Sequence, residues 1–162
     1  MKKLICILLA ICCLCSVSLA EEINPFAPFV LTLPDGAALE EREGTYTIVH
    51  DMTRVVVIVI DRVPDADPPA AIIRLMTQFE PLAIIGEDLV LAEGFTGLTS
   101  LKEDPAGKAA DQVNIMVLSD KGDLLILSGY DMNGDRDQLQ QLLDAILKGA
   151  TVDGASIVPT EE

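Results

Sequence analysis

Four oxygen-bearing side chains alternate along one short segment, and their spacing suggests a metal site. Asp131, Asn133, Asp135 and Asp137 occupy every second position. A twelve-residue calcium-binding loop draws oxygen ligands from its first, third and fifth positions, and a bidentate carboxylate at its twelfth position closes the shell. A low-affinity calcium or cation site in this loop is therefore one hypothesis for the chain.

The second half of the segment departs from that pattern. Counted from Asp131, the sixth position should be glycine and is Arg136, while the ninth and twelfth positions are Leu139 and Leu142. Both leucines belong to an apolar series that continues at helical spacing to Leu147. The ligands that should complete the calcium shell are therefore replaced by residues of a predicted helix core.

A helix start explains the same oxygen-bearing residues. Gly134 turns the chain, Asp135 is placed to cap the helix, and Gln138 lies three residues later, where it can bond back to the cap. Asp137 then falls in the first turn, where the helix dipole favours a carboxylate. We predict that this segment begins a helix and holds no specific metal ion, and we assign no cofactor.

Catalytic chemistry finds little support elsewhere in the sequence. His50 is the only histidine, and no serine lies in a Gly-x-Ser-x-Gly segment. We expect His50 to be an exposed or edge residue at a turn. Phosphate-binding glycine patterns are absent, and one histidine with no cysteine outside residues 1–20 cannot form the usual zinc sites. We predict a non-enzymatic protein without catalytic residues.

Two acids could still act as a hydrolytic pair. Asp61 ends a predicted central strand and Asp88 opens a later one, so both could lie at one end of a sheet. Carboxylates that share a hydrolytic site lie roughly 5 to 9.5 Å apart. A two-carboxylate hydrolase is the third hypothesis, although solvated strand ends explain both residues more simply.

The N-terminus predicts export. Met1-Lys2-Lys3 is a basic start, Leu4–Leu14 is an apolar run, and Ser18-Leu19-Ala20 supplies small residues before Glu21. This is the layout of a secretory signal peptide cleaved between Ala20 and Glu21. The apolar run is shorter than the roughly 20 residues that span a bilayer. We predict a secreted or extracytoplasmic protein of the periplasm, cell envelope or medium, without stable membrane insertion after cleavage.

All four cysteines lie within this signal segment, so the mature chain would carry no disulfide and no thiolate metal site. The residue before each cysteine is Ile, Cys or Leu rather than a small one, which makes lipid anchoring the weaker alternative. Cleavage would also remove Lys2 and Lys3 but none of the 26 acids, which changes the formal charge from −15 to −17. So acidic a surface repels phosphate groups, and we predict no nucleic acid partner and no peripheral membrane binding.

The chain divides into short β-rich runs and two helical stretches. In the first half we predict strands at Phe29–Leu33, Thr45–Val49 and Arg54–Val63, the last apolar on both faces and therefore central, with Glu40–Gly44 as a solvated connector. A helix should begin at Asp67-Pro68, end near Glu80, and bury Ile72, Ile73, Met76 and Phe79. The second half predicts a strand at Asp88–Thr96, a hairpin of Val113–Leu118 and Leu124–Ser128 turning at Gly122, and a closing helix from about Asp135.

This order favours the α+β class. Links of hairpin length predict an antiparallel sheet of about six strands, covered by two amphipathic helices. We expect one globular domain over residues 29–149, preceded by an extended leader at 21–28 and followed by a flexible acidic tail at 150–162.

The layout resembles the PsbP-like fold, which includes extrinsic photosystem proteins and DcrB-type bacterial envelope proteins. The resemblance covers about Phe29–Gly149 and depends on the opening "FVLTLPDG" strand and turn, the element order and the terminal amphipathic helix. Ala37-Ala38 stand where members often carry an aromatic residue, and no functional residue of the family has a matching motif here. The resemblance implies a secreted accessory or binding role.

The leading hypothesis is therefore an exported, non-enzymatic binding or accessory protein. Its partner would be an unidentified protein or small ligand of the envelope or medium. The low-affinity cation-binding protein that uses the Asp131–Asp137 loop is the alternative.

Overall fold

The computed structural model describes residues 24–63, 68–104 and 110–159. The predicted signal peptide, with its cleavage point between Ala20 and Glu21, lies outside these residues. Within the described part, no helix is both long and apolar enough to cross a membrane.

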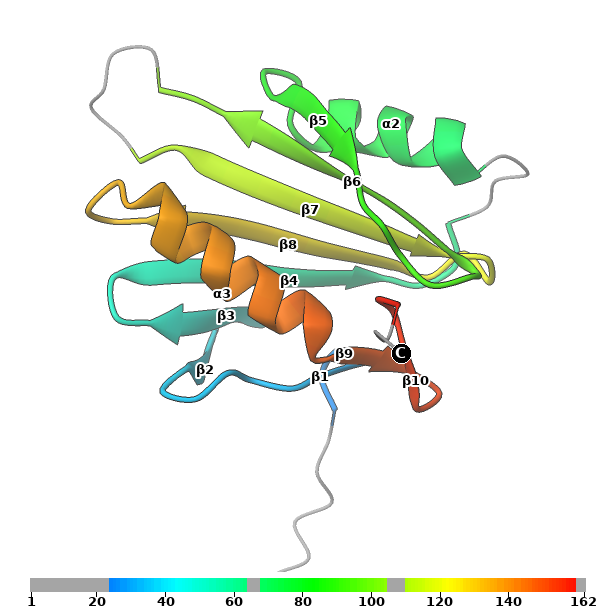
Figure 1. Ribbon diagram of the computed structural model, residues 1–162, viewed down its shortest axis with the longest axis horizontal. Coiled ribbons are helices and arrows are strands. Elements are labelled where there is room, and N and C mark those ends of the chain that lie inside the picture. Colours follow the sequence, from blue (N-terminus) through cyan, green and yellow to red (C-terminus); the bar gives the residue numbers. More distant parts are fainter. Residues whose placement is uncertain (1–23, 64–67, 105–109, 160–162) are drawn as a thin grey trace, which may run out of the picture.

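Ten strands and two helices are formed by the described residues, and every strand pair among them is antiparallel. Seven strands form one sheet in the order β2-β3-β4-β8-β7-β6-β5, and β1, β9 and β10 form a second, smaller one (Figure 1). In chain order the elements are β1 (Phe29–Leu31), β2 (Ala38–Arg42), β3 (Thr45–His50), β4 (Thr53–Ile60), α2 (Pro68–Phe79), β5 (Ile84–Asp88), β6 (Phe95–Lys102), β7 (Gln112–Ser119), β8 (Leu124–Asp131), α3 (Arg136–Lys148), β9 (Ala150–Val152) and β10 (Ala155–Ser156). The structure is mostly antiparallel sheet with two helices, in keeping with the α+β class.

Each helix packs on one face of the seven-stranded sheet. Alternate side chains of a strand point to opposite faces, so Val55 and Val57 of β4 and Leu127 of β8 join the core beneath α3, which crosses the front of the sheet in Figure 1. Ile126 of β8 and Met116 of β7 join the core beneath α2, which packs against β6 and β7 on the other face. The predicted β7–β8 hairpin is confirmed, with Gly122 at positive φ in its turn.

Cover on the α2 face is incomplete. The central position of β4 is confirmed, because β4 pairs with β3 and β8. Its α2-side residues are less protected than predicted, however, since Ile58 is half-buried and Ile60 is 42% exposed. The buried apolar face of α2 is also narrower than predicted. Ile72 and Met76 are buried against the sheet, whereas Ile73 and Phe79 are exposed.

Two predicted boundaries were wrong. The connector predicted at Glu40–Gly44 is largely the edge strand β2, which pairs with β3 while all its side chains stay exposed. Most of the strand predicted at Asp88–Thr96 is the loop between β5, which ends at Asp88, and β6, which begins at Phe95. Its apolar residues Leu89 and Leu91 pack against the sheet beside Gly97, where a Cβ atom would lie only 2.7 Å from Leu91 Cδ1. Apolar residues that resemble a strand in sequence therefore form a loop that covers the sheet.

The chain ends are more ordered than predicted. Residues 150–159 are not a flexible tail, because β9 pairs with β1 and β10, and Ile157 is fully buried. The Ala92 N–H donates to the Ile157 carbonyl at 3.0 Å, which joins this segment to the β5–β6 loop. In the predicted leader, Phe26 is buried and its ring meets that of Tyr46 edge-on at 5.5 Å. Both ends therefore complete the core beneath α3.

Candidate binding groove between α3 and β5

Asp131, the first residue of the acidic loop, stabilises the turn that follows β8. Asp131 is only 2% exposed, and its carboxylate accepts hydrogen bonds from the Thr53 hydroxyl at 2.8 Å, the Asn133 N–H at 2.8 Å and the Asp135 N–H at 3.0 Å. Burial alone would raise the pKa of Asp131, but these hydrogen bonds outweigh it and hold the pKa below its ordinary value. The ionised Asp131 side chain therefore stabilises the loop between β8 and α3 by accepting these hydrogen bonds.

The other loop residues divide between cap and surface. Asp135 is the N-cap of α3 and accepts from the Gln138 N–H at 3.0 Å, as predicted. Asn133 and Asp137 are exposed. Across residues 24–63, 68–104 and 110–159, no three His, Cys, Asp or Glu side chains are arranged to hold a metal ion. The four predicted metal ligands are close in sequence. The carboxylates of Asp131 and Asp135, however, accept hydrogen bonds from backbone N–H groups.

The remaining sequence candidates lie far apart. Asp61 follows β4 and Asp88 ends β5, and the sheet order puts β8, β7 and β6 between those strands. Four strand spacings separate them by about 19 Å, too far for a shared hydrolytic site. His50 ends β3, is partly exposed, and lies 4.0 Å from the Asp51 carboxylate. These positions do not assemble a catalytic set.

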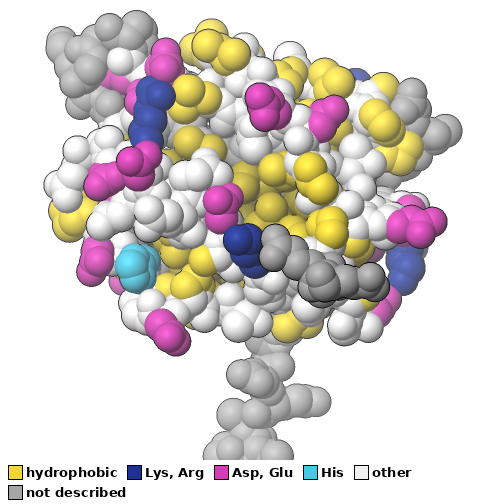
Figure 2. Space-filling view, in the orientation of Figure 1, with side chains coloured by type: hydrophobic (Ala, Val, Ile, Leu, Met, Phe, Trp, Pro, Cys, Tyr) yellow, Lys and Arg dark blue, Asp and Glu magenta, His cyan; other side chains and the backbone are white. Residues whose placement is uncertain are grey.

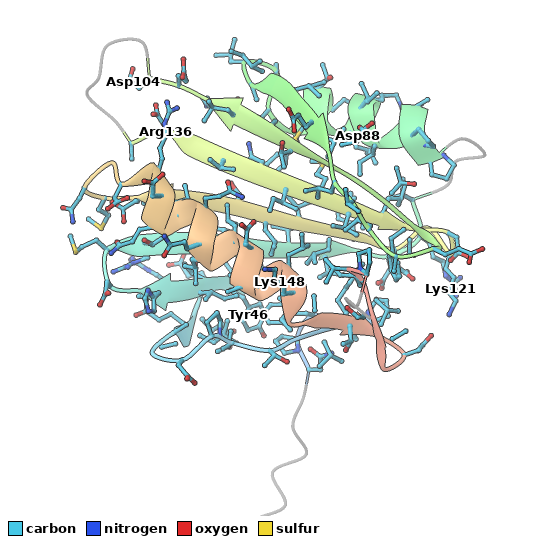
Figure 3. The ribbon with its side chains drawn as sticks, viewed as in Figure 1. Tyr46, Asp88, Asp104, Lys121, Arg136 and Lys148 are labelled. Carbon is cyan, nitrogen blue, oxygen red and sulfur yellow. The ribbon has the colours of Figure 1, made fainter. Side chains whose placement is uncertain are left out.

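Two contacts fix the position of α3 on the sheet. At Gly129 of β8, an added Cβ atom would lie 2.6 Å from Leu139 Cδ1, so the helix approaches β8 as closely as a glycine allows. At its N-terminus, Arg136 donates to the carboxylates of Asp111 and Glu103, which flank the β6–β7 connection (Figure 3). Donation from Arg136 lowers the pKa of Asp111, and the acceptor carboxylates of Glu103 and Asp111 raise the pKa of Arg136. The helix therefore lies over β8 and β4, with its N-terminus bound to the two ends of the β6–β7 connection.

A groove remains between α3 and the β5 side of the sheet. One hollow of about 610 Å³ lies at the N-terminal half of α3, and another of about 430 Å³ lies near its C-terminus; Val90 lines both. Figure 2, in the orientation of Figure 1, shows hydrophobic side chains in the region between α3 and strands β5 and β6, with acidic side chains around them. The apolar lining includes Leu89, Leu101 and Val113 in the first hollow and Leu147 in the second. We call this surface the α3–β5 groove.

The rim of the α3–β5 groove is acidic. Glu87 and Asp88 stand on the strand side, and Asp137 and Asp144 stand on the helix side, all four exposed. Arg136 also borders the groove, but its guanidinium is bound to two acids outside the rim. Lys148 is the remaining cation of the lining, at the C-terminal end of the helix (Figure 3).

Sequence reasoning did not find this groove. Its helix-side acids, Asp137 and Asp144, lie about two helical turns apart, and the sequence analysis considered only Asp137, as a residue of the first helical turn. Its strand-side residues lie at the β5–β6 boundary, which was predicted wrongly. A signal was nevertheless present, because Glu87-Asp88 is followed directly by Leu89-Val90, a charged pair beside an apolar pair with no helical or strand period.

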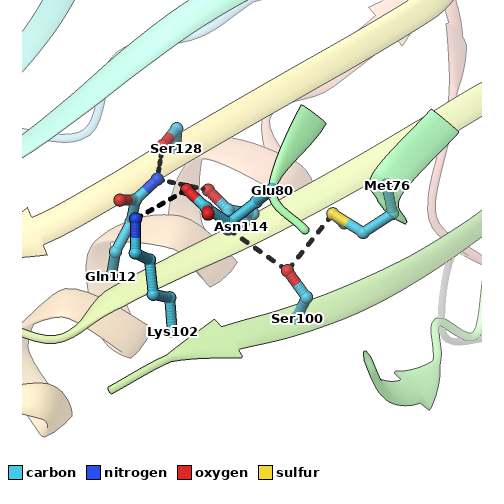
Figure 4. A network of polar contacts seen from close by, with 7 residues as sticks. All are labelled: Met76, Glu80, Ser100, Lys102, Gln112, Asn114 and Ser128. Carbon is cyan, nitrogen blue, oxygen red and sulfur yellow. Dashed lines mark hydrogen bonds and ion pairs between the residues drawn. The ribbon is translucent and has the colours of Figure 1, made fainter. Parts of the chain in front are cut away.

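A polar network on the opposite face is structural. Gln112 Nε2 donates to Asn114 Oδ1 at 3.0 Å and to Ser128 Oγ at 2.8 Å, and Asn114 Nδ2 donates to Ser100 Oγ at 3.2 Å (Figure 4). The Ser100 hydroxyl contacts the Met76 sulfur of α2 at 3.2 Å. Among the described residues no buried side-chain nitrogen or oxygen lacks a partner. This network ties β6, β7 and β8 together beneath α2.

Comparison with known proteins does not supply a function. No protein-family model matches the chain, and no curated protein matches it. The function is therefore inferred from the groove.

Proposed function

We propose that this chain is an exported, non-enzymatic binding or accessory protein of the cell envelope or medium. In this proposal it holds a cationic segment of a partner protein in the α3–β5 groove. Export is supported by the signal-peptide pattern before Glu21. The accessory role agrees with the resemblance to the PsbP-like fold, in which two amphipathic helices enclose an antiparallel sheet.

The observation that carries this proposal is an apolar floor bordered by acids. Leu89 and Leu101 offer apolar contact, while Glu87, Asp88 and Asp137 stand around them. The two hollows adjoin at Val90 and follow the length of α3, which suits an extended ligand better than a compact one. A formal charge of −15 attracts cations to the whole surface, and the rim concentrates that attraction at one place.

The proposal is tested with two labelled eight-residue peptides, one alternating lysine and valine and the other alternating glutamate and valine. Fluorescence anisotropy should show saturable binding of the lysine peptide only, weakened by added salt. Neutralising the helix side of the rim with Asp137→Asn and Asp144→Asn removes two exposed attractions worth together about 1 kcal/mol, which corresponds to roughly fivefold weaker binding.

The matched control neutralises two acids at the opposite edge of the sheet, Glu40→Gln and Glu41→Gln. This pair changes the net charge equally, and binding should stay within about twofold of wild type. Equal losses in both double variants would refute a localised site, as would failure of the lysine peptide to bind. Reproducible turnover by the purified protein, lost on changing one acid, would overturn the non-enzymatic assignment.

A further inference from the structure

The edge strand β5 is open and apolar. It ends the strand order of the large sheet, and among the described residues it pairs only with β6, in a register that shifts between Ile85 and Asp88. All five of its residues are exposed, and Ile84 and Ile85 are 66% and 41% exposed. Every second residue of an edge strand directs its N–H and C=O away from the sheet, where another strand can pair with them.

The opposite edge shows how such a strand is usually protected. Three of the five residues of β2 are charged, Glu40, Glu41 and Arg42, and charge on an edge opposes pairing with other chains. In β5 the only charges are the two acids that end it, and its first half reads Ile84-Ile85-Gly86. Leu82, just before the strand, is 78% exposed and extends the apolar surface.

The two faces of β5 differ in what a neighbouring strand would meet. Ile84 lies opposite Leu101, which lines the α3–β5 groove, so that face leads to the acidic rim. Ile85 lies opposite Ser100, which contacts α2, so the other face is the α2 side of the sheet. A strand added beside β5 would direct alternate side chains to the acidic rim and to the α2 side.

We propose that an extended segment of a partner protein, with basic and apolar residues in alternation, adds to β5 as the outermost strand of the sheet. Its basic side chains lie on the α3 side of the sheet, beside Glu87 at the strand side of the rim, and its apolar side chains cover Ile85 on the α2 side. The backbone bonds supply affinity, and the alternation supplies specificity. This inference rests on the proposed function, because it places the cationic segment along the strand side of the acidic rim.

Charge argues against a second copy of the chain at this edge. Antiparallel pairing of two β5 strands about Gly86 would set Ile84 opposite Asp88 and Ile85 opposite Glu87, which places acids against apolar side chains. Both copies would also carry the same excess of acids. A cationic partner strand meets neither penalty.

The experiment adds two N-methylated forms of the lysine–valine peptide. In a strand, the N–H groups of alternate residues point to opposite edges, so methylating all lysine nitrogens blocks one edge and methylating all valine nitrogens blocks the other. We expect one methylated peptide to bind at least tenfold more weakly than the other. On binding of the unmodified peptide, the amides of Ile84, Ile85 or Gly86 should become protected from hydrogen exchange.

A pair of edge variants gives an independent readout. Ile85→Lys places a cation on β5, and Leu39→Lys does the same on β2, at positions 41% and 38% exposed in wild type. Peptide binding should fall about tenfold in the first variant and stay unchanged in the second. If both methylated peptides bind as tightly as the unmodified one, strand addition is overturned while the proposed function stands. If the unmodified peptide does not bind, both are overturned, and a dimer that Ile85→Lys dissociates would assign the edge to a second copy.

Discussion

Replacing Asp131 by alanine should lower the free energy of unfolding by about 3 kcal/mol. The change removes the acceptor of the Thr53 hydroxyl, which is fully buried, and an unsatisfied buried donor costs about 1 to 3 kcal/mol. The N–H groups of Asn133 and Asp135 also lose their acceptor, but they are only partly buried, so water can replace it. Each of these two bonds should contribute about 0.5 to 1 kcal/mol.

Urea unfolding followed by circular dichroism measures this change, with Asp137→Ala as the control. Asp137 belongs to the same acidic segment but lies in the first turn of α3 and is exposed, and its interaction with the helix dipole is worth about 0.3 to 1 kcal/mol. An equal, small cost for both variants would refute the conclusion that Asp131 organises the loop.

The pH dependence gives a second check on the same residue. Because the pKa of Asp131 lies below its ordinary value of 3.8 in the folded protein, its ionised form adds stability that is complete above that value. This contribution is lost as pH falls through the folded-state pKa. The stability difference between wild type and Asp131→Asn should therefore be constant near neutral pH and shrink in acid. A difference that grows in acid would contradict the assignment.

Three further outcomes follow from the packing and from the loop. Gly129→Ala should destabilise the protein by about 1 to 3 kcal/mol through overpacking against Leu139, and by less in a Leu139→Ala background, measured as a double-mutant cycle in urea. Ile157→Ala should cost about 2 to 5 kcal/mol, whereas no change would restore the flexible-tail prediction. Calcium added to the mature domain in a calorimeter should give no saturable heat, and saturable heat that disappears on Asp131→Ala with Asp135→Ala would establish the cation site.

The best sequence predictions were those in which periodicity and local chemistry agreed. The helix from Arg136 has an apolar stripe, an aspartate cap and a glycine after its end, and the structure contains all three. The β7–β8 hairpin likewise combined two short apolar runs with a glycine turn. In these elements the signal lies within about a dozen residues, so that the rest of the chain need not be known.

The failures concern residues whose burial is decided by distant segments. Leu89 and Leu91 predict a strand because they are apolar, but in the structure they are half-buried in a loop that packs over Gly97. Ile157 belongs to the core because β9 returns to pair with β1, more than a hundred residues away in sequence. Both wrongly predicted segments form part of the groove. The loop that carries Leu89 forms its wall, and the C-terminal segment closes the end near the C-terminus of α3.

Stability and proposed binding depend on different residues of the same elements. On α3, Leu139 faces the core, whereas Asp137 and Asp144 lie on its exposed side and border the groove. On β5, pairing with β6 uses one edge of the backbone and leaves the other edge open. Changes at the rim should therefore alter partner binding with little effect on unfolding, and changes such as Ile157→Ala should do the reverse. This separation makes the binding proposals testable in a folded protein, because loss of binding in a rim variant of wild-type stability cannot be attributed to loss of the fold.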